Sequence, residues 1–73
     1  MAKKKNQYDQ HHRKPRSLGG ATDPTNLATV RKSHHQHWHG IFGNMTAEQI
    51  IRYINAKWID PDYVVVLYRK QQN

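Results

Sequence analysis

The chain contains no cysteine, which excludes disulfide bonds and metal sites built from thiolates. A domain of 73 residues buries only about 60% of the surface that its unfolded chain exposes. Proteins of this size therefore often need a staple, that is, a further stabilising link such as a disulfide, a bound metal or a partner chain. Without cysteine, the staple open to this chain is a metal held by histidine, or a partner. Six histidines are present, and all of them lie between His11 and His39.

Long apolar runs and acidic residues are both scarce. No run approaches the ~20 residues of a membrane span, and the start, MAKKKNQ, lacks the apolar stretch of a secretory signal. With neither a signal nor cysteine, an intracellular location is expected. Five acidic residues against twelve lysines and arginines give a net charge of +7, which favours nucleic acid as the partner. A basic protein without such a partner is the alternative.

The first half of the chain predicts a pair of strands joined by a long loop. Residues 1–7 are polar and rich in lysine, which indicates a disordered basic arm. Residues 8–12 and 26–30 (NLATV) predict two short strands. Residues 13–25, between them, hold two prolines and two glycines and predict a loop. A loop of this length in so small a domain is usually functional or disordered.

The second half predicts two helices and a strand. Ser33 followed by Gln36 has the form of a capping box and predicts a helix from His34 to about Gly43, with Gly43 or Asn44 giving a left-handed exit. A second capping box begins at Thr46 and predicts a helix over residues 47–58. Asp60-Pro61 ends it, and residues 63–68 (YVVVLY) carry the strongest strand signal of the chain.

These elements predict an α+β fold with one structural domain. Residues 8–43 form a ββα unit, and residues 44–73 form a scaffold of one helix and one strand that covers it. The core of the scaffold is expected from Ile50, Ile54, Trp58 and residues 64–67.

The histidines are spaced as a metal site would require. His35 and His39 lie one turn apart on the predicted helix, where two imidazoles can bind one ion, although this spacing alone is a weak signal. His11 and His12 are neighbours on a strand and point to opposite faces, so one can complete the metal site while the other faces the substrate. Two exposed histidines are the alternative. His37 is expected to face solvent or a phosphate.

Taken together, HHRKPRSLGG (residues 11–20), Asn26-Leu27 and His35 resemble the HNH endonuclease family. The motif of that family has Asp-His or His-His, a proline three residues after the second position, a glycine pair, an asparagine that opens the second strand, and a histidine on the helix. With His39 the pattern is similar to the nuclease domains of bacterial colicins, where three histidines hold the metal. Many family members carry two CxxC pairs, which this chain lacks, and the residues after Phe42 match nothing associated with the motif.

The resemblance implies a small ββα-metal fold and gives each matched position a role. His11, His35 and His39 take the metal positions, His12 takes that of the general base, and Asn26 orients the base or fixes the loop. One divalent ion is implied, and an all-imidazole shell favours Zn²⁺, Ni²⁺, Co²⁺ or Mn²⁺, with Mg²⁺ plausible if His11 does not bind it. Trp38 and Phe42 are expected to form the core under this site.

The expected function is metal-dependent hydrolysis of DNA phosphodiester bonds with low sequence specificity. Five basic residues are expected to bind phosphates along the approach to the metal: Arg13, Lys14, Arg16, Arg31 and Lys32. The alternatives are a basic nucleic-acid-binding protein without catalysis and a structural metal-binding module that meets an acidic protein. A chain this short is expected to act in the cytoplasm, bacterial or phage-encoded, with a larger complex such as phage packaging machinery.

Overall fold

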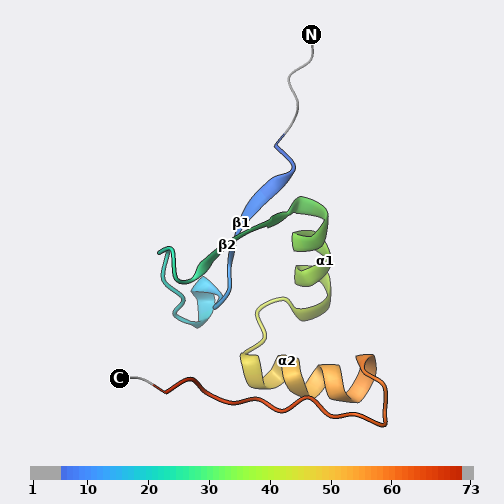
Figure 1. Ribbon diagram of the computed structural model, residues 1–73. Helices are drawn as coiled ribbons and strands as arrows, with labels where there is room; N and C mark the ends of the chain where they lie inside the picture. The colour runs from blue at the N-terminus through green and yellow to red at the C-terminus, as the bar shows by residue number, and fades with distance from the viewer. Residues whose placement is uncertain (1–5, 72–73) are drawn as a thin grey trace.

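Two short antiparallel strands and two helices make up the ordered elements of the computed structural model, which describes residues 6–71 (Figure 1). The predicted α+β class is confirmed. The predicted disordered arm over residues 1–7 lies outside the described residues except for Asn6 and Gln7. None of the helices in the described residues has the length and apolarity needed to span a membrane.

Strands β1 (Tyr8–His12) and β2 (Leu27–Arg31) pair antiparallel, with Tyr8 opposite Arg31 and His12 opposite Leu27. The first strand is as predicted. The second begins one residue later than predicted, because the backbone N–H groups of Asn26 and Leu27 both donate to the Asp23 carbonyl and so place Asn26 in a turn. A short 3₁₀ turn, η1 (Arg16–Leu18), lies in the loop between the strands.

The side chain of Asn26 ties the loop together. Its Oδ1 accepts from the Lys14 N–H at 2.7 Å, and its Nδ2 donates to the carbonyls of Lys14 and Ala21 at 3.0 and 2.8 Å. Gly20 passes so close to this point that a Cβ atom would collide with the Lys14 carbonyl and lie 2.9 Å from the Asn26 amide nitrogen. The second glycine of the pair therefore serves a close approach of two backbone segments.

Helix α1 (Lys32–Phe42) follows β2 without a loop and packs on both strands. The predicted capping box of Ser33 and Gln36 is wrong, because the N-cap is Arg31 and makes no side-chain capping bond. Since β2 runs directly into the helix, Ser33 already lies within the first turn. The backbone N–H of Lys32 donates to the Gln7 carbonyl at 2.8 Å. The helix ends at Gly43 as predicted, with a positive φ of 52°, but the ψ of −122° shows that the exit is not the left-handed conformation that was expected.

Helix α2 (Ala47–Tyr53) begins with the predicted capping box. The Gln49 N–H donates to the Thr46 hydroxyl at 3.2 Å, and the Thr46 N–H donates to the Gln49 side chain at 2.9 Å. Helical structure continues to Trp58 as predicted, but residues 54–58 form a π-helical turn, η2 (Ile54–Trp58), in which the Ile59 N–H donates to the Ile54 carbonyl. Phe42 contacts Trp38 within α1, and its ring contact with Tyr53 joins α1 to α2.

The predicted C-terminal strand is wrong. Residues 63–68 are extended and run alongside α2 and η2 (Figure 1), but they pair with no strand within the described residues. The Asn55 side chain holds this segment by donating to the Val65 carbonyl at 2.9 Å and accepting from the Val65 N–H at 2.8 Å. Strand propensity describes the fit of a side chain to a pleated, half-buried surface, so without a neighbouring strand it does not produce a strand here.

The predicted core of the scaffold is also wrong. Trp58, Val64, Val66 and Leu67 are exposed, and none of residues 6–71 is fully buried. Ile50 and Ile54 are half-buried. Packing in the described part of the chain therefore depends on half-buried side chains and on polar ties such as those of Asn26 and Asn55.

A matched pair of glycine substitutions tests the tie in the loop. Gly20→Ala should lower the free energy of unfolding by about 1–3 kcal/mol, because the new methyl group overlaps the Lys14 backbone. Gly40→Ala is the control, since nothing lies near its Cβ position in α1, and it should stabilise the protein by about 0.5–1 kcal/mol. Urea unfolding measures both, and equal effects of the two substitutions would contradict the structure.

Candidate metal centre

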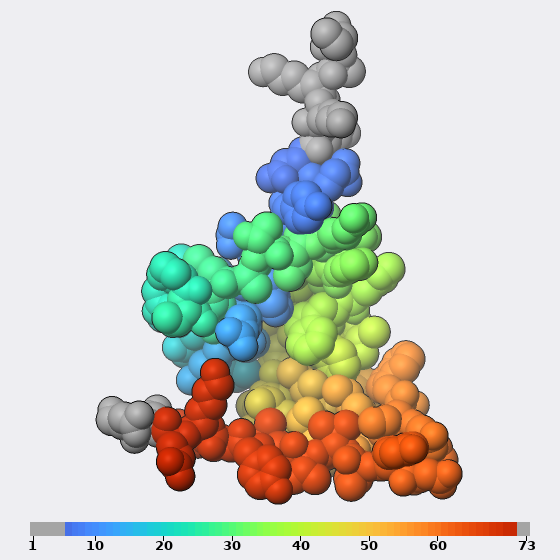
Figure 2. All heavy atoms as spheres, in the orientation of Figure 1, coloured from blue at the N-terminus to red at the C-terminus, as the bar shows by residue number. Residues whose placement is uncertain are grey.

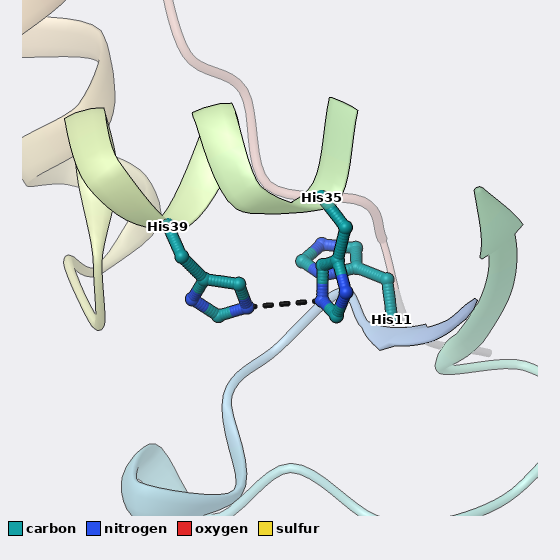
Figure 3. A group of neighbouring side chains, drawn as sticks. All are labelled: His11, His35 and His39. Atoms are coloured by element: carbon teal, nitrogen blue, oxygen red, sulfur yellow. Dashed lines mark hydrogen bonds between the residues drawn. The ribbon is translucent and has the colours of Figure 1, made fainter. Parts of the chain in front are cut away.

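Three histidines from two elements converge on one point (Figure 3). His11 comes from β1, and His35 and His39 come from successive turns of α1. One ring nitrogen of each lies within 4.8 Å of those of the other two. Because α1 packs on β1, the histidine of the strand meets the pair on the helix although 24 positions separate it from His35. The structure therefore brings together the three residues that the sequence assigns to the metal.

Asp9 is a neighbour of this cluster that the sequence analysis missed. Its Oδ2 atom lies 3.1 Å from Nδ1 of His35. Asp9 and His11 are two residues apart on β1 and so share a face of the strand, which is the signal that would have identified it. A carboxylate that accepts from Nδ1–H of His35 fixes the ring orientation and leaves the lone pair of Nε2 free for a metal.

The Nε2 atoms of His35 and His39 lie 3.0 Å apart, and the dashed line in Figure 3 joins the two rings, which are inclined to each other by 63°. A neutral imidazole has one donor and one acceptor nitrogen. With Nδ1–H of His35 directed at Asp9, its Nε2 is an acceptor, so His39 supplies the proton between them. When His39 carries its proton on Nδ1 instead, both Nε2 lone pairs are available to one cation.

The surroundings of His11 favour the charge state that metal binding requires. Burial lowers the pKa of His11 below its ordinary value of 6.5, and the nearby His35 and His39 lower it further. A neutral imidazole is the form that coordinates a metal. Its Nδ1 atom is buried and has no hydrogen-bond partner among the described residues. A buried polar atom without a partner destabilises a fold, so this atom, together with the all-imidazole donor set, fits a bound divalent ion.

His12, the next residue on β1, is not a member of the three-histidine cluster. Its Nε2 atom lies 3.0 Å from the hydroxyl oxygen of Thr22, a contact that the sequence analysis did not anticipate. The amide of Asn26 binds the backbone of Lys14 and Ala21. Of the two roles left open for Asn26, the described contacts match fixing the loop, and Thr22 follows directly on the residue that Asn26 holds.

One cavity of about 330 Å³ borders both the three-histidine cluster and His12. Its wall includes all three residues of the cluster, His12 and Arg16. A larger hollow of about 500 Å³ also borders His11 and His35, and its surface is mainly apolar, with Trp38 among the lining residues. Trp38 lies beside the site, with its ring centroid 6.0 Å from that of His11, but Trp38 and Phe42 are only half-buried and do not form the buried core that was expected under the site.

The five predicted phosphate-binding residues do not share one position. Arg16 lies in the wall of the histidine cavity, and Arg13 lines the apolar hollow. Lys14 is exposed in the loop. Arg31 and Lys32 lie at the other end of the hairpin, since Arg31 is opposite Tyr8 and Leu27 is opposite His12. The expectation that these residues line the approach to the metal therefore fits Arg16 and its neighbours in the loop better than it fits Arg31 and Lys32.

The remaining histidines, His34 and His37, are exposed on α1.

No protein-family model, curated protein or solved structure matches the chain. The function of the site is therefore inferred from the geometry of its own side chains.

Measuring Zn²⁺ affinity tests whether the three histidines bind a metal and whether Asp9 supports that binding by orienting His35. His39→Ala should abolish tight binding, and Asp9→Asn should weaken it by about 10–100-fold, because the His35 ring loses the carboxylate that orients it. Asp62→Asn is the matched control, since this carboxylate is exposed in the C-terminal segment, and it should leave the affinity unchanged. Calorimetric titration measures all three, and unchanged affinity in the Asp9 variant would remove Asp9 from the site.

Proposed function

We propose that the chain is a metal-dependent endonuclease of the HNH type that hydrolyses DNA phosphodiester bonds with little sequence preference. The observation that carries this proposal is the convergence of His11, His35 and His39, with His12 in the wall of the same cavity. The order strand, strand, helix over residues 8–42 is compatible with the ββα-metal unit that the sequence resemblance implies.

His11, His35 and His39 would hold the divalent ion, and Asp9 would orient His35. The ion supplies positive charge that stabilises the transition state of phosphoryl transfer and the departing oxygen. Three imidazoles favour Zn²⁺, Ni²⁺, Co²⁺ or Mn²⁺ over Mg²⁺, which prefers oxygen ligands.

His12 would act as the general base. If its Nε2–H donates to the Thr22 hydroxyl, the lone pair of Nδ1 is free to take a proton from the attacking water. The water oxygen then forms a bond to phosphorus while the bond to the leaving 3′-oxygen breaks. Asn26 supports this arrangement indirectly, since it holds Ala21 and thereby the loop from which Thr22 reaches His12.

Basic residues would bind the DNA backbone around the cavity. Arg16 stands in the wall beside His12, where its guanidinium can bind a phosphate oxygen. Phosphate contacts position a nucleic acid and carry no base information, which supports low sequence specificity. Selection of a target would then belong to a larger cytoplasmic complex, such as phage packaging machinery, in which the chain takes part.

Substitution of His12 separates catalysis from metal binding. His12→Ala should lower the rate of nicking of supercoiled plasmid by about 10²–10⁴-fold, because the proton acceptor is lost, while Zn²⁺ affinity stays unchanged. His37→Ala is the matched control, because this histidine is exposed on α1 and lines none of the histidine cavity. Assays across a panel of divalent ions provide the measurement.

Nicking that survives the loss of His12 would refute catalysis at this site. The protein would then be a nucleic-acid-binding protein without catalysis, stapled by its metal.

The salt dependence of DNA binding tests the basic surface. The logarithm of the affinity should fall linearly with the logarithm of salt concentration, and Arg16→Gln should reduce the slope by about 0.9 because one phosphate contact is lost. Arg52→Gln, on the exposed surface of α2, is the control and should keep the slope of the unmodified chain. Absence of duplex binding at about 50 mM salt would contradict the proposed substrate.

A further inference from the structure

The C-terminal segment (residues 60–70) begins with a turn, in which the Tyr63 N–H donates to the Asp60 carbonyl, and continues as an extended chain. Its apolar side chains are exposed, except that of Val65, which is half-buried. Tyr63 and Val64 are 69% and 70% exposed, and Tyr68 is 86% exposed. Figure 2 shows this segment, in orange and red, spread along one side of the molecule next to α2. Six consecutive residues of high strand propensity, YVVVLY, thus have no strand partner within the described residues, and of the six only Val65 is half-buried.

One edge of the segment is occupied and the other is open. The N–H and C=O groups of one residue in an extended chain point to the same edge, and those of Val65 bind the Asn55 side chain. The backbone groups of Val64, Val66 and Tyr68 point to the opposite edge. They form no hydrogen bond with any part of residues 6–71. Such an edge is a template for pairing with another strand.

The charges at its ends select the partner. Asp60 and Asp62 precede the apolar run, Arg69 and Lys70 follow it, and no charged residue lies between. When two identical segments pair antiparallel, the acidic end of each lies against the basic end of the other. Parallel pairing would instead place like charges together, which is unfavourable.

We propose that two copies of the chain form a closed dimer by antiparallel pairing of their C-terminal segments through the free edge. A two-fold axis at Val66 places Val66 opposite its copy, Val64 opposite Tyr68 of the second copy, and Asp62 opposite Lys70 of the second copy. The backbone groups of Val64, Val66 and Tyr68 all face the open edge, so the ladder of hydrogen bonds is continuous over Val64 to Tyr68. Asp62 lies in the turn before this stretch, where its N–H donates to Asp60 Oδ1, and it meets Lys70 of the second copy through its side chain.

The dimer supplies what this half of the chain lacks. None of residues 6–71 is fully buried, and the histidine cluster staples only β1 to α1. In Figure 1 the C-terminal segment lies beside α2, at the far end of the molecule from β1. Pairing would cover Tyr63 to Tyr68 with apolar residues of the second copy. This inference does not depend on the proposed nuclease activity, because it uses none of the residues of the metal centre.

Sedimentation equilibrium of the full chain over a wide concentration range tests the dimer. A species of twice 8.6 kDa is expected. Asp62→Lys and Lys70→Asp should each weaken dimerisation by about tenfold, because the affected pair occurs twice, and the double variant should restore it. Glu48→Lys, an exposed charge reversal in the first turn of α2, should change nothing. Weakening without restoration would overturn the antiparallel register.

Cysteine cross-linking gives a second measurement, because the chain has no cysteine of its own. Val66→Cys should form a disulfide between chains, since residues opposite each other in a ladder lie about 5.5 Å apart at Cα, within the range that a disulfide spans. Ser33→Cys, exposed on α1, should not. A monomer at every concentration, an open-ended polymer, or cross-linking only at residue 33 would overturn the proposal.

Discussion

The contact of His11 on β1 with the His35–His39 pair on α1 is the interaction on which the rest of the structure depends. It joins the hairpin to the helix in a chain that has no cysteine and, within residues 6–71, no fully buried residue. Burial lowers the pKa of His11, so the same packing that brings the three rings together favours the neutral form of this ring, which is the form that binds a cation. The fold and the proposed chemistry therefore depend on one contact.

In this chain two asparagine side chains hold together segments that are distant in the sequence, which in a larger protein is mainly done by a hydrophobic core. Asn26 binds the backbone of Lys14 and Ala21, and Asn55 binds the N–H and C=O of Val65. In both cases a side-chain amide pairs with the backbone of a remote segment, much as a neighbouring strand would. An amide satisfies only one or two residues of that segment, however, which is why the C-terminal segment keeps an open edge.

Local rules predicted the site better than the scaffold. The helical period placed His35 and His39 on one face, and strand alternation separated His11 from His12; the same alternation places Asp9 beside the cluster. The capping box at Ser33 failed because β2 continues into α1, which no local pattern records. The strand over residues 63–68 failed because a strand is defined by its partner, and the sequence of one chain does not state whether a partner is present.

Charge links the metal centre to the proposed substrate. A net charge of +7 opposes the approach of a divalent cation, and Asp9 is the carboxylate that the described residues place against the cluster. Phosphates bound beside Arg16 would bring negative charge to the wall of the same cavity and reduce this opposition. Since coupling between two bound species is reciprocal, a metal in the histidine cluster would in turn strengthen the binding of the phosphates.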